Sequence, residues 1–272
     1  MIFNLLKYYF STIYWDKASV DAVKRMQLKK FREIFEYARI NSKFYKNLYD
    51  DAGVLELKIE SISDIEKIPV IDKYLLKKYD YQDILTRPIT NKLNLHPTSG
   101  STGEPFKIYQ NKFEDYTAHV RVFIMLQTLG YNPFRNITMI TRYESDDKFK
   151  VEGDIRILSK LQKYLNLFQR HIISIYEEPA VIIKKVVQNK PFILWSTPSV
   201  LDMVANELLM QNKRLDIPYV VLTSENIAPH QYKKFFSCIS KNVIGLYGLM
   251  EAPSLAYDIN NTGRLLTFPN TF

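Results

Sequence analysis

Apolar side chains in the first third of the chain recur at the spacing of a helix. Within residues 20–52, Phe31, Phe35 and Ala38 follow one another at steps of four and three, which places them on one helical face. Gly53 then predicts the end of the helical stretch, because glycine readily takes the left-handed conformation found just after a helix C-terminus.

Shorter helices are expected next. Ser63 and Glu66 have the spacing of a capping box, in which each side chain bonds a backbone N–H at the helix start. Pro69 ends that helix early, because the residue before a proline is pushed out of the helical conformation. Residues 72–79 predict another short helix. Residues 1–90 are therefore expected to form a helical section, and they carry no group of polar residues that suggests chemistry.

After residue 90 the pattern changes to short apolar runs that alternate with amphipathic stretches. This alternation predicts an α/β fold over residues 91–272, with a mostly parallel sheet and covering helices. In such sheets, ligands bind in the loops that follow the carboxyl ends of the strands. The strands expected are 137–141, 192–196, 219–223 and 242–247, and the helical stretches are 114–129, 179–189 and 198–211.

Composition places the chain among ordinary globular proteins. Its 272 residues are 46% hydrophobic and 24% charged, and 8 glycines with 12 prolines exclude a disordered or collagen-like chain. The single cysteine, Cys238, excludes an internal disulfide and suits a reducing cytoplasm. The net charge of +8 is spread evenly, with 17 basic and 13 acidic residues in 1–97 and 20 and 16 in 98–272. Without a basic stripe or arm, nucleic acid is not an expected partner.

The first ten residues are apolar and aromatic but are interrupted by Asn4 and Lys7. They fall short of the about 20 apolar residues that a membrane span needs. We expect this segment to be a helix that packs on the body of the protein. The alternative is a helix that lies on a membrane surface as a weak peripheral contact, which its aromatic residues and Lys7 would suit.

The most distinctive run joins hydroxyl residues and glycines. Glycines let a backbone approach a ligand closely, and neighbouring N–H groups then form a concave anion site to which hydroxyls add donors. The run is not a Walker A loop, because no Gly-Lys-[Ser/Thr] closes it. By composition alone, a plain serine- and glycine-rich turn is the favoured interpretation. Its residues are Thr98, Ser99, Gly100, Ser101, Thr102 and Gly103, followed by Glu104 and Pro105.

The order of this run resembles a known signature. Thr-Ser-Gly-Ser-Thr-Gly-x-Pro at 98–105 is similar to the phosphate loop of the adenylate-forming enzymes, the acyl-CoA synthetase and ligase superfamily. Residues 247–251, Tyr-Gly-Leu-Met-Glu, resemble its Tyr-Gly-x-Thr-Glu motif, and 223–227 stand in the place of its Gly/Ala-Glu-Pro loop. Residues 37–45 and the Pro-Val connector at 68–73 resemble the phenylacetate-CoA ligase branch and its capsule-biosynthesis relatives.

This resemblance implies AMP-forming ligation. A carboxylate attacks the α-phosphate of ATP to give an acyl-adenylate and pyrophosphate, and a thiol such as coenzyme A then takes the acyl group. Residues 98–103 would hold the β- and γ-phosphates. Glu251 would be the catalytic residue that holds Mg²⁺, since this cation prefers carboxylate and phosphate oxygens. Tyr247 would lie against adenine, with Ser224, Glu225 and Gly248 lining the base pocket.

Taken singly, these residues have plainer interpretations. Ser224 and Glu225 would be an ordinary helix start, Tyr247 would pack at a strand end, and Glu251 would begin a solvated helix. It is the order and spacing of the three motifs together that favour the nucleotide site.

Two departures from the superfamily pattern bear on activity. Met250 replaces a threonine whose hydroxyl the superfamily places at the α-phosphate. After Glu251, the superfamily continues with a ribose-binding aspartate and a small C-terminal lid that carries a catalytic lysine. The sequence ends at Phe272 without that lid, and Asp258 stands outside the context of the ribose ligand. We therefore expect an incomplete large domain of adenylate-forming type, weak or inactive by itself.

Two functions of different kinds are compatible with this sequence. The first is ATP-dependent activation of a small-molecule carboxylate in the cytoplasm, with coenzyme A as co-substrate, in a cell-surface polysaccharide pathway. The second is a nucleotide-binding remnant without catalysis, or one half of a split enzyme whose lid is a separate polypeptide. The acid itself is not predicted, because the acid pockets of the superfamily are lined by variable apolar residues.

Overall fold

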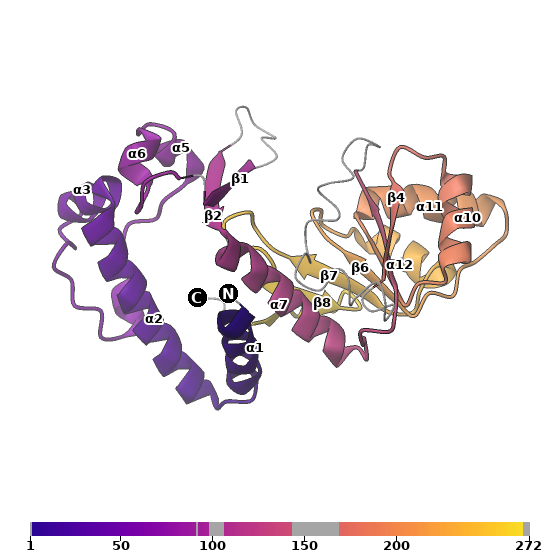
Figure 1. Cartoon of the computed structure of the whole chain (residues 1–272), viewed down its shortest axis with the longest axis horizontal. Coiled ribbons are helices and arrows are strands. Elements are labelled where there is room, and N and C mark those ends of the chain that lie inside the picture. Colours follow the sequence, from indigo (N-terminus) through magenta and orange to yellow (C-terminus); the bar gives the residue numbers. More distant parts are fainter. Residues whose placement is uncertain (1, 91, 98–105, 143–168, 269–272) are drawn as a thin grey trace. The chain divides into compact units, whose positions relative to one another are not determined.

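The computed structural model describes residues 2–90, 92–97, 106–142 and 169–268 (Figure 1). Within these ranges the chain forms two compact units. The first holds the described residues up to Arg121 together with Met250–Ala252 and Phe268, and the second holds the described residues between Val122 and Leu249 together with Pro253–Thr267. No helix among the described residues has the length and apolar character needed to span a membrane.

The first unit is mainly helical. Its elements are α1 (Ile2–Asp16), α2 (Val20–Asn41), α3 (Lys43–Asp51), α4 (Ile62–Ile65), α5 (Lys73–Leu76), α6 (Tyr81–Ile84), β1 (Leu93–Pro97) and β2 (Lys107–Asn111). Helix α7 (Lys112–Thr128) begins in this unit and ends in the second. Rings of Phe35 in α2 and Tyr49 in α3 stack with centroids 4.6 Å apart, and Val54 and Ile59 complete the apolar core around them.

The helical stretch predicted over 20–52 is present but is divided at Ser42. This residue is extended, ends α2 and begins α3, where its Oγ accepts a hydrogen bond from the Tyr45 N–H. The same hydroxyl lies 2.9 Å from the carbonyl oxygens of Asp83 and Ile84, both in α6. One buried serine therefore starts a helix and connects it to a neighbouring one, a role that the hydrophobic spacing does not reveal.

The capping box predicted from Ser63 and Glu66 is wrong by two residues. Helix α4 starts at Ile62, so Ser63 already lies inside it, and Ser61 is the extended residue that precedes it. The Asp64 carboxylate accepts hydrogen bonds from the backbone N–H and the hydroxyl of Ser61, both at 2.9 Å. Lys67, 2.8 Å away, and these donors hold the pKa of Asp64 well below its usual range.

The second unit is a twisted sheet whose central strands are parallel. Strand order is β4-β3-β5-β6-β7-β8-β9, with parallel pairing from β4 through β7 and antiparallel pairing of β7 with β8 and of β8 with β9. The strands are β3 (Ile137–Thr141), β4 (Arg170–Ser174), β5 (Ile193–Ser196), β6 (Tyr219–Leu222), β7 (Val243–Tyr247), β8 (Ala256–Ile259) and β9 (Leu266–Thr267). The predicted α/β fold is confirmed.

Among the described residues of this unit, three helices pack on the sheet: α10 (Pro179–Asn189), α11 (Pro198–Met210) and α12 (Pro229–Cys238). Alternate strand residues such as Leu194, Val220 and Val243 join Ile182, Leu201, Leu208 and Phe235 of the helices in one apolar core. Neighbouring helices in this layer contact each other, α10 with α11 and α11 with α12. Strands β4, β5 and β6 therefore each lead through a loop into a helix that packs in this core.

Candidate functional site

Two neighbouring parallel strands bring the predicted base-pocket residues to one edge of the sheet. Ser224 and Glu225 come directly after β6, whereas Tyr247 ends β7 and Gly248 follows it. The strands pair from Val220↔Val243 to Leu222↔Gly245, so both loops leave the same edge. The structure thus gathers four residues that lie more than twenty positions apart in the sequence at the carboxyl edge, where sheets of this kind bind ligands.

The Glu225 side chain is held by the start of the neighbouring helix. Its Oε2 accepts from the Ser199 N–H at 2.9 Å and its Oε1 accepts from the Ser199 hydroxyl at 2.8 Å. Ser199 lies in the first turn of α11, where N–H groups lack partners within the helix and the helix dipole favours negative charge. Glu225 therefore ties the loop after β6 to the loop after β5, a contact that the sequence did not predict.

The loop after β6, which this contact holds, has an unusual backbone conformation. Ser224 has φ = +73°, the left-handed region that residues with a Cβ rarely occupy. On one side, the Thr223 N–H donates to the Ser196 carbonyl at 3.2 Å, and on the other Glu225 is bound to Ser199. Contacts on both sides therefore keep this loop in a conformation that costs about 1 kcal/mol or more.

We expect the Ser199–Glu225 contact to stabilise the second unit measurably. Glu225→Ala should lower the free energy of unfolding by about 0.5–1 kcal/mol, because both side chains are exposed and water replaces part of the lost hydrogen bonding. Ser199→Ala removes only the hydroxyl and should cost less. In urea unfolding of the single and double variants, the double variant should lose no more than Glu225→Ala alone, whereas additive losses would show that the two side chains act separately.

Tyr247 and Gly248 occupy distinct environments. The carbonyl of Tyr247 accepts a hydrogen bond from the Leu255 N–H at 2.9 Å. The Tyr247 side chain is about half exposed (48%), so its ring is available to a planar ligand. At Gly248, a Cβ would lie 2.6 Å from the Ser254 nitrogen and 3.3 Å from the Pro253 Cα. A glycine is therefore required here by the close passage of the chain itself, independently of any ligand.

A buried hydroxyl at the same edge was not predicted. Ser196 ends β5 with 1% of its surface exposed, and its Oγ has no hydrogen-bond partner among the described residues. Buried polar groups are normally paired, so such a hydroxyl marks a place where a water or ligand atom would be satisfied. Only its position at the end of a strand could have suggested it from sequence.

Glu251 lies in the first unit, where its carboxylate forms an ion pair with Lys73 at 3.3 Å. Lys73 starts α5 and belongs to the Pro-Val connector at 68–73, so two segments of the family resemblance meet. Next to Glu251, the Met250 carbonyl lies 3.5 Å from the Gln110 amide of β2. Sequence reasoning identified Glu251 and the connector separately but not this contact.

The surroundings of Glu251 suit a cation that is also bound by a ligand's phosphates, rather than a metal site whose ligands all come from the protein. Its side chain is 40% exposed, and no three His, Cys, Asp or Glu side chains cluster as a metal site in the described part of the chain. Mg²⁺ commonly takes one or two carboxylates and completes its shell with phosphates and water. A single accessible carboxylate fits that pattern once the ion pair with Lys73 is exchanged for the cation.

Of the predicted phosphate loop and Asp258, only Asp258 lies among the described residues. Residues 98–105 lie outside the described residues; the strands on either side, β1 and β2, pair antiparallel up to Pro97↔Lys107. Asp258 accepts hydrogen bonds from the N–H groups of Thr262 and Gly263 at 2.9 and 2.8 Å. Its carboxylate thus organises the turn between β8 and β9, which accounts for the acid at this position without a ligand.

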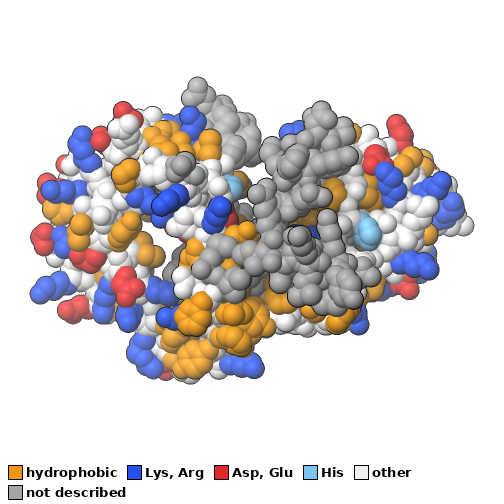
Figure 2. Space-filling view, in the orientation of Figure 1, with side chains coloured by type: hydrophobic (Ala, Val, Ile, Leu, Met, Phe, Trp, Pro, Cys, Tyr) orange, Lys and Arg blue, Asp and Glu red, His pale blue; other side chains and the backbone are white. Residues whose placement is uncertain are grey.

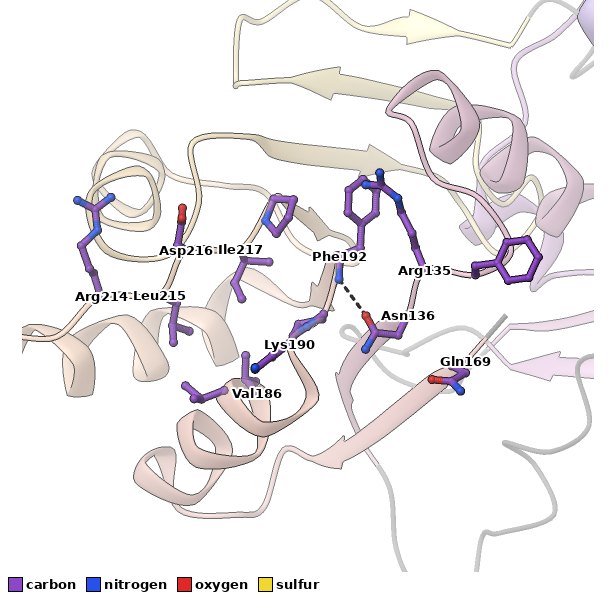
Figure 3. A pocket seen from close by; sticks show the side chains of 14 residues that line it. Arg135, Asn136, Gln169, Val186, Lys190, Phe192, Arg214, Leu215, Asp216 and Ile217 are labelled. Atoms are coloured by element: carbon purple, nitrogen blue, oxygen red, sulfur yellow. Dashed lines mark hydrogen bonds between the residues drawn. The ribbon is translucent and has the colours of Figure 1, made fainter. Parts of the chain in front are cut away.

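A pocket of about 780 Å³ lies at the opposite, amino edge of the same sheet (Figure 3). It is lined by the residues that directly precede the strands, among them Asn136 and Phe192, and the Phe192 N–H donates to the Asn136 side chain at 3.1 Å. The Arg135 guanidinium lies over the Phe192 ring, 3.9 Å from its centre. None of the predicted site residues lines this pocket, so it is an alternative place on the same sheet for a ligand to bind.

Known proteins resemble this chain in part of its sequence and in most of its fold. Over 90 residues it is 29% identical to the phenylacetate-coenzyme A ligase of Escherichia coli (strain K12) and 28% identical to that of Pseudomonas putida. The matched residues make up 33% of this chain, 21% of the first relative and 20% of the second. No protein-family model matches the chain.

Crystal structures of 2-hydroxyisobutyryl-CoA ligase in complex with 2-HIB-AMP and CoA share the fold. An open conformation gives a TM-score of 0.69 and the thioesterification state gives 0.66, both at 15% identity. The matches cover 90% and 92% of this chain but only 58% and 54% of that ligase. The predicted resemblance to phenylacetate-CoA ligase is confirmed, the fold is shared with the solved ligase, and the chain spans little more than half of the length of that structural relative.

Proposed function

We propose that the chain is the nucleotide-binding part of an AMP-forming acid–CoA ligase that activates a small-molecule carboxylate. The observation that carries this proposal is the meeting of Ser224, Glu225, Tyr247 and Gly248 at the carboxyl edge of a parallel sheet. Support comes from the local identity to phenylacetate-CoA ligases and from the fold shared with 2-hydroxyisobutyryl-CoA ligase.

In this proposal each group has a defined task. Tyr247 lays its exposed ring against adenine, and the strained loop at Ser224 presents backbone groups to the base edge. Residues 98–103 hold the β- and γ-phosphates of ATP. Glu251 would hold Mg²⁺ in place of its ion pair with Lys73, and the cation would supply positive charge to neutralise the phosphates. Coenzyme A then takes the acyl group.

The setting of this reaction is part of the same proposal. The single cysteine is buried and free, which suits a reducing cytoplasm. The resemblance of the connector at 68–73 to capsule-biosynthesis relatives supports a role in a cell-surface polysaccharide pathway.

A second candidate is a chain that binds nucleotide without turning it over, either as a remnant or as one half of a split enzyme. Met250 favours it, because methionine offers no hydroxyl at the α-phosphate. Carboxylate-dependent ATP–pyrophosphate exchange over a panel of aryl and alkyl acids separates the candidates. Exchange that is lost in Glu251→Ala supports the ligase, binding without exchange supports the remnant, and exchange restored by an added lid polypeptide supports the split enzyme.

Tyr247 provides the test of the base pocket. We expect the 272-residue chain to bind Mg-ATP weakly but measurably in calorimetry at millimolar ligand. Tyr247→Ala should weaken this binding about tenfold or more, because base–aromatic stacking is worth about 1–3 kcal/mol. Tyr247→Phe keeps the ring and should bind as the original chain does. No binding to well-folded protein, or equal binding by the alanine variant, would contradict the assignment.

A further inference from the structure

Helix α1 presents a continuous apolar stripe to solvent. Phe3, Leu6, Phe10 and Tyr14 are spaced by three, four and four residues, which aligns them along one face of the helix. Their side chains are between 51% and 78% exposed. Figure 2 shows hydrophobic side chains gathered over the region where Figure 1 places α1. The segment is a helix, as expected, but this face of it is not the one that packs on the body of the protein.

The opposite face of α1 is the one that packs on the protein. The Tyr8 hydroxyl accepts from the Arg121 guanidinium at 2.7 Å, and the Tyr8 ring meets Phe113 of α7 edge to face, with centroids 6.4 Å apart. Thr12, one turn further along, is buried. These contacts hold the face with Tyr8 and Thr12 against the protein, so the opposite face with the apolar stripe is turned to solvent.

The charge around the stripe is positive. Residues 1–33 hold seven basic and three acidic side chains, whereas residues 34–97 hold ten of each, so the positive charge of the first third lies in this segment. Lys7 lies beside the stripe on α1, and Lys17, Lys24, Arg25 and Lys29 are exposed on the next turn and on α2. None of these five cations has a carboxylate within ion-pair distance in the described ranges.

We propose that this stripe binds the surface of an anionic lipid bilayer. A helix of 15 residues is shorter than the about 20 that a membrane span needs, so α1 would lie in the plane of the interface. Aromatic and aliphatic side chains then enter the boundary between headgroups and acyl chains, and flanking lysines and arginines attract anionic headgroups. The basic rim favours this occupant over a second copy of the chain, whose matching rim would carry the same charge.

Vesicle cosedimentation of the whole chain tests this proposal without any use of its activity. We expect binding to vesicles of phosphatidylcholine with phosphatidylglycerol, little binding to phosphatidylcholine alone, and weaker binding as salt is raised. Replacing Phe3 and Phe10 together by serine should reduce the partition coefficient at least about a hundredfold, since each buried aromatic side chain contributes roughly tenfold or more.

Two matched variants and a folding check keep the outcome interpretable. Phe134→Ser removes a phenylalanine that is 77% exposed in the second unit and should bind vesicles as the original chain does. Replacing Phe3 and Phe10 by tryptophan should retain binding, because tryptophan suits the interface. Thermal melting followed by circular dichroism checks that each variant is folded.

Three results would overturn the proposal. The first is an original chain that stays in solution with anionic vesicles. The second is unchanged binding by the double serine variant. The third is a dimer in light scattering that the same variant dissociates while no vesicle binding occurs, which would identify the stripe as an interface between copies.

Discussion

Gly248→Val is expected to lower the free energy of unfolding by about 3 kcal/mol, a large fraction of the stability of a typical domain. Even a Cβ at this position would lie 2.6 Å from the Ser254 nitrogen and 3.3 Å from the Pro253 Cα, and these are backbone atoms that cannot rotate away. Valine adds two further methyl groups to the same space. Urea unfolding followed by circular dichroism measures the loss, and Gly248→Ala should show an intermediate value.

Gly245→Ala is the matched control for this prediction. At Gly245 a new Cβ would meet only the Cδ1 of Ile227, at 3.3 Å, and the end of a side chain can move. We expect this variant to lose less than about 1 kcal/mol. Equal losses at the two glycines would show that the close passage at Gly248 is not what requires glycine there.

Gly100→Val is expected to reduce Mg-ATP affinity at least about a hundredfold while the melting temperature changes little. In the proposed phosphate loop, valine keeps the backbone N–H groups away from the phosphates, and each hydrogen bond to a charged oxygen is worth roughly 1.5–3 kcal/mol. Loss of two such bonds corresponds to a hundredfold or more. Calorimetric titration of both proteins with Mg-ATP measures the difference.

Ser101→Ala serves as the control in the same titration. It removes a single hydroxyl and leaves the backbone unchanged, so at most one such bond is lost and the affinity should fall clearly less than in Gly100→Val. If Gly100→Val binds Mg-ATP as tightly as the original chain, the run at 98–105 is the plain turn that its composition alone suggests.

Much of the second unit could be predicted because its strands and helices are buried. The predicted strand 137–141 and helix 179–189 have the bounds that the structure gives to β3 and α10. A buried strand needs a short apolar run, and a buried helix needs apolar residues on one face, so both leave a local pattern. Strand β4 begins with Arg170 and His171, and β9 has two residues, so neither carries a run long enough to be recognised.

In the first unit the unpredicted features depend on contacts distant in sequence. Ser42 breaks a helix whose apolar spacing continues through it, and its partners Asp83 and Ile84 lie about 40 residues further on. The exposed stripe of α1 shows the same limit, because spacing identifies an apolar face but not what covers it. Only the contacts of Tyr8 decide which face of α1 is turned inward.

The candidate site was predicted from motif order, and its contacts were not. The structure has Ser224 and Glu225 after β6, and Tyr247 and Gly248 at the end of β7, while their role in binding a nucleotide stays a prediction. Sequence could not indicate that Glu225 binds the start of α11, that Lys73 faces Glu251, or that Gly248 is constrained by Ser254. Each of these contacts joins loops whose separation in space depends on the complete fold.

Photolabelling with 8-azido-ATP, followed by mass spectrometry of the labelled peptides, tests directly whether ATP binds at the carboxyl edge of the sheet. The same sheet offers two edges, with the predicted base-pocket residues at the carboxyl edge and the pocket of about 780 Å³ at the amino edge. The account predicts label within residues 219–228 or 243–250 that excess ATP removes. Label confined to residues 134–136, 190–192 or 214–218, at the amino edge, would contradict it.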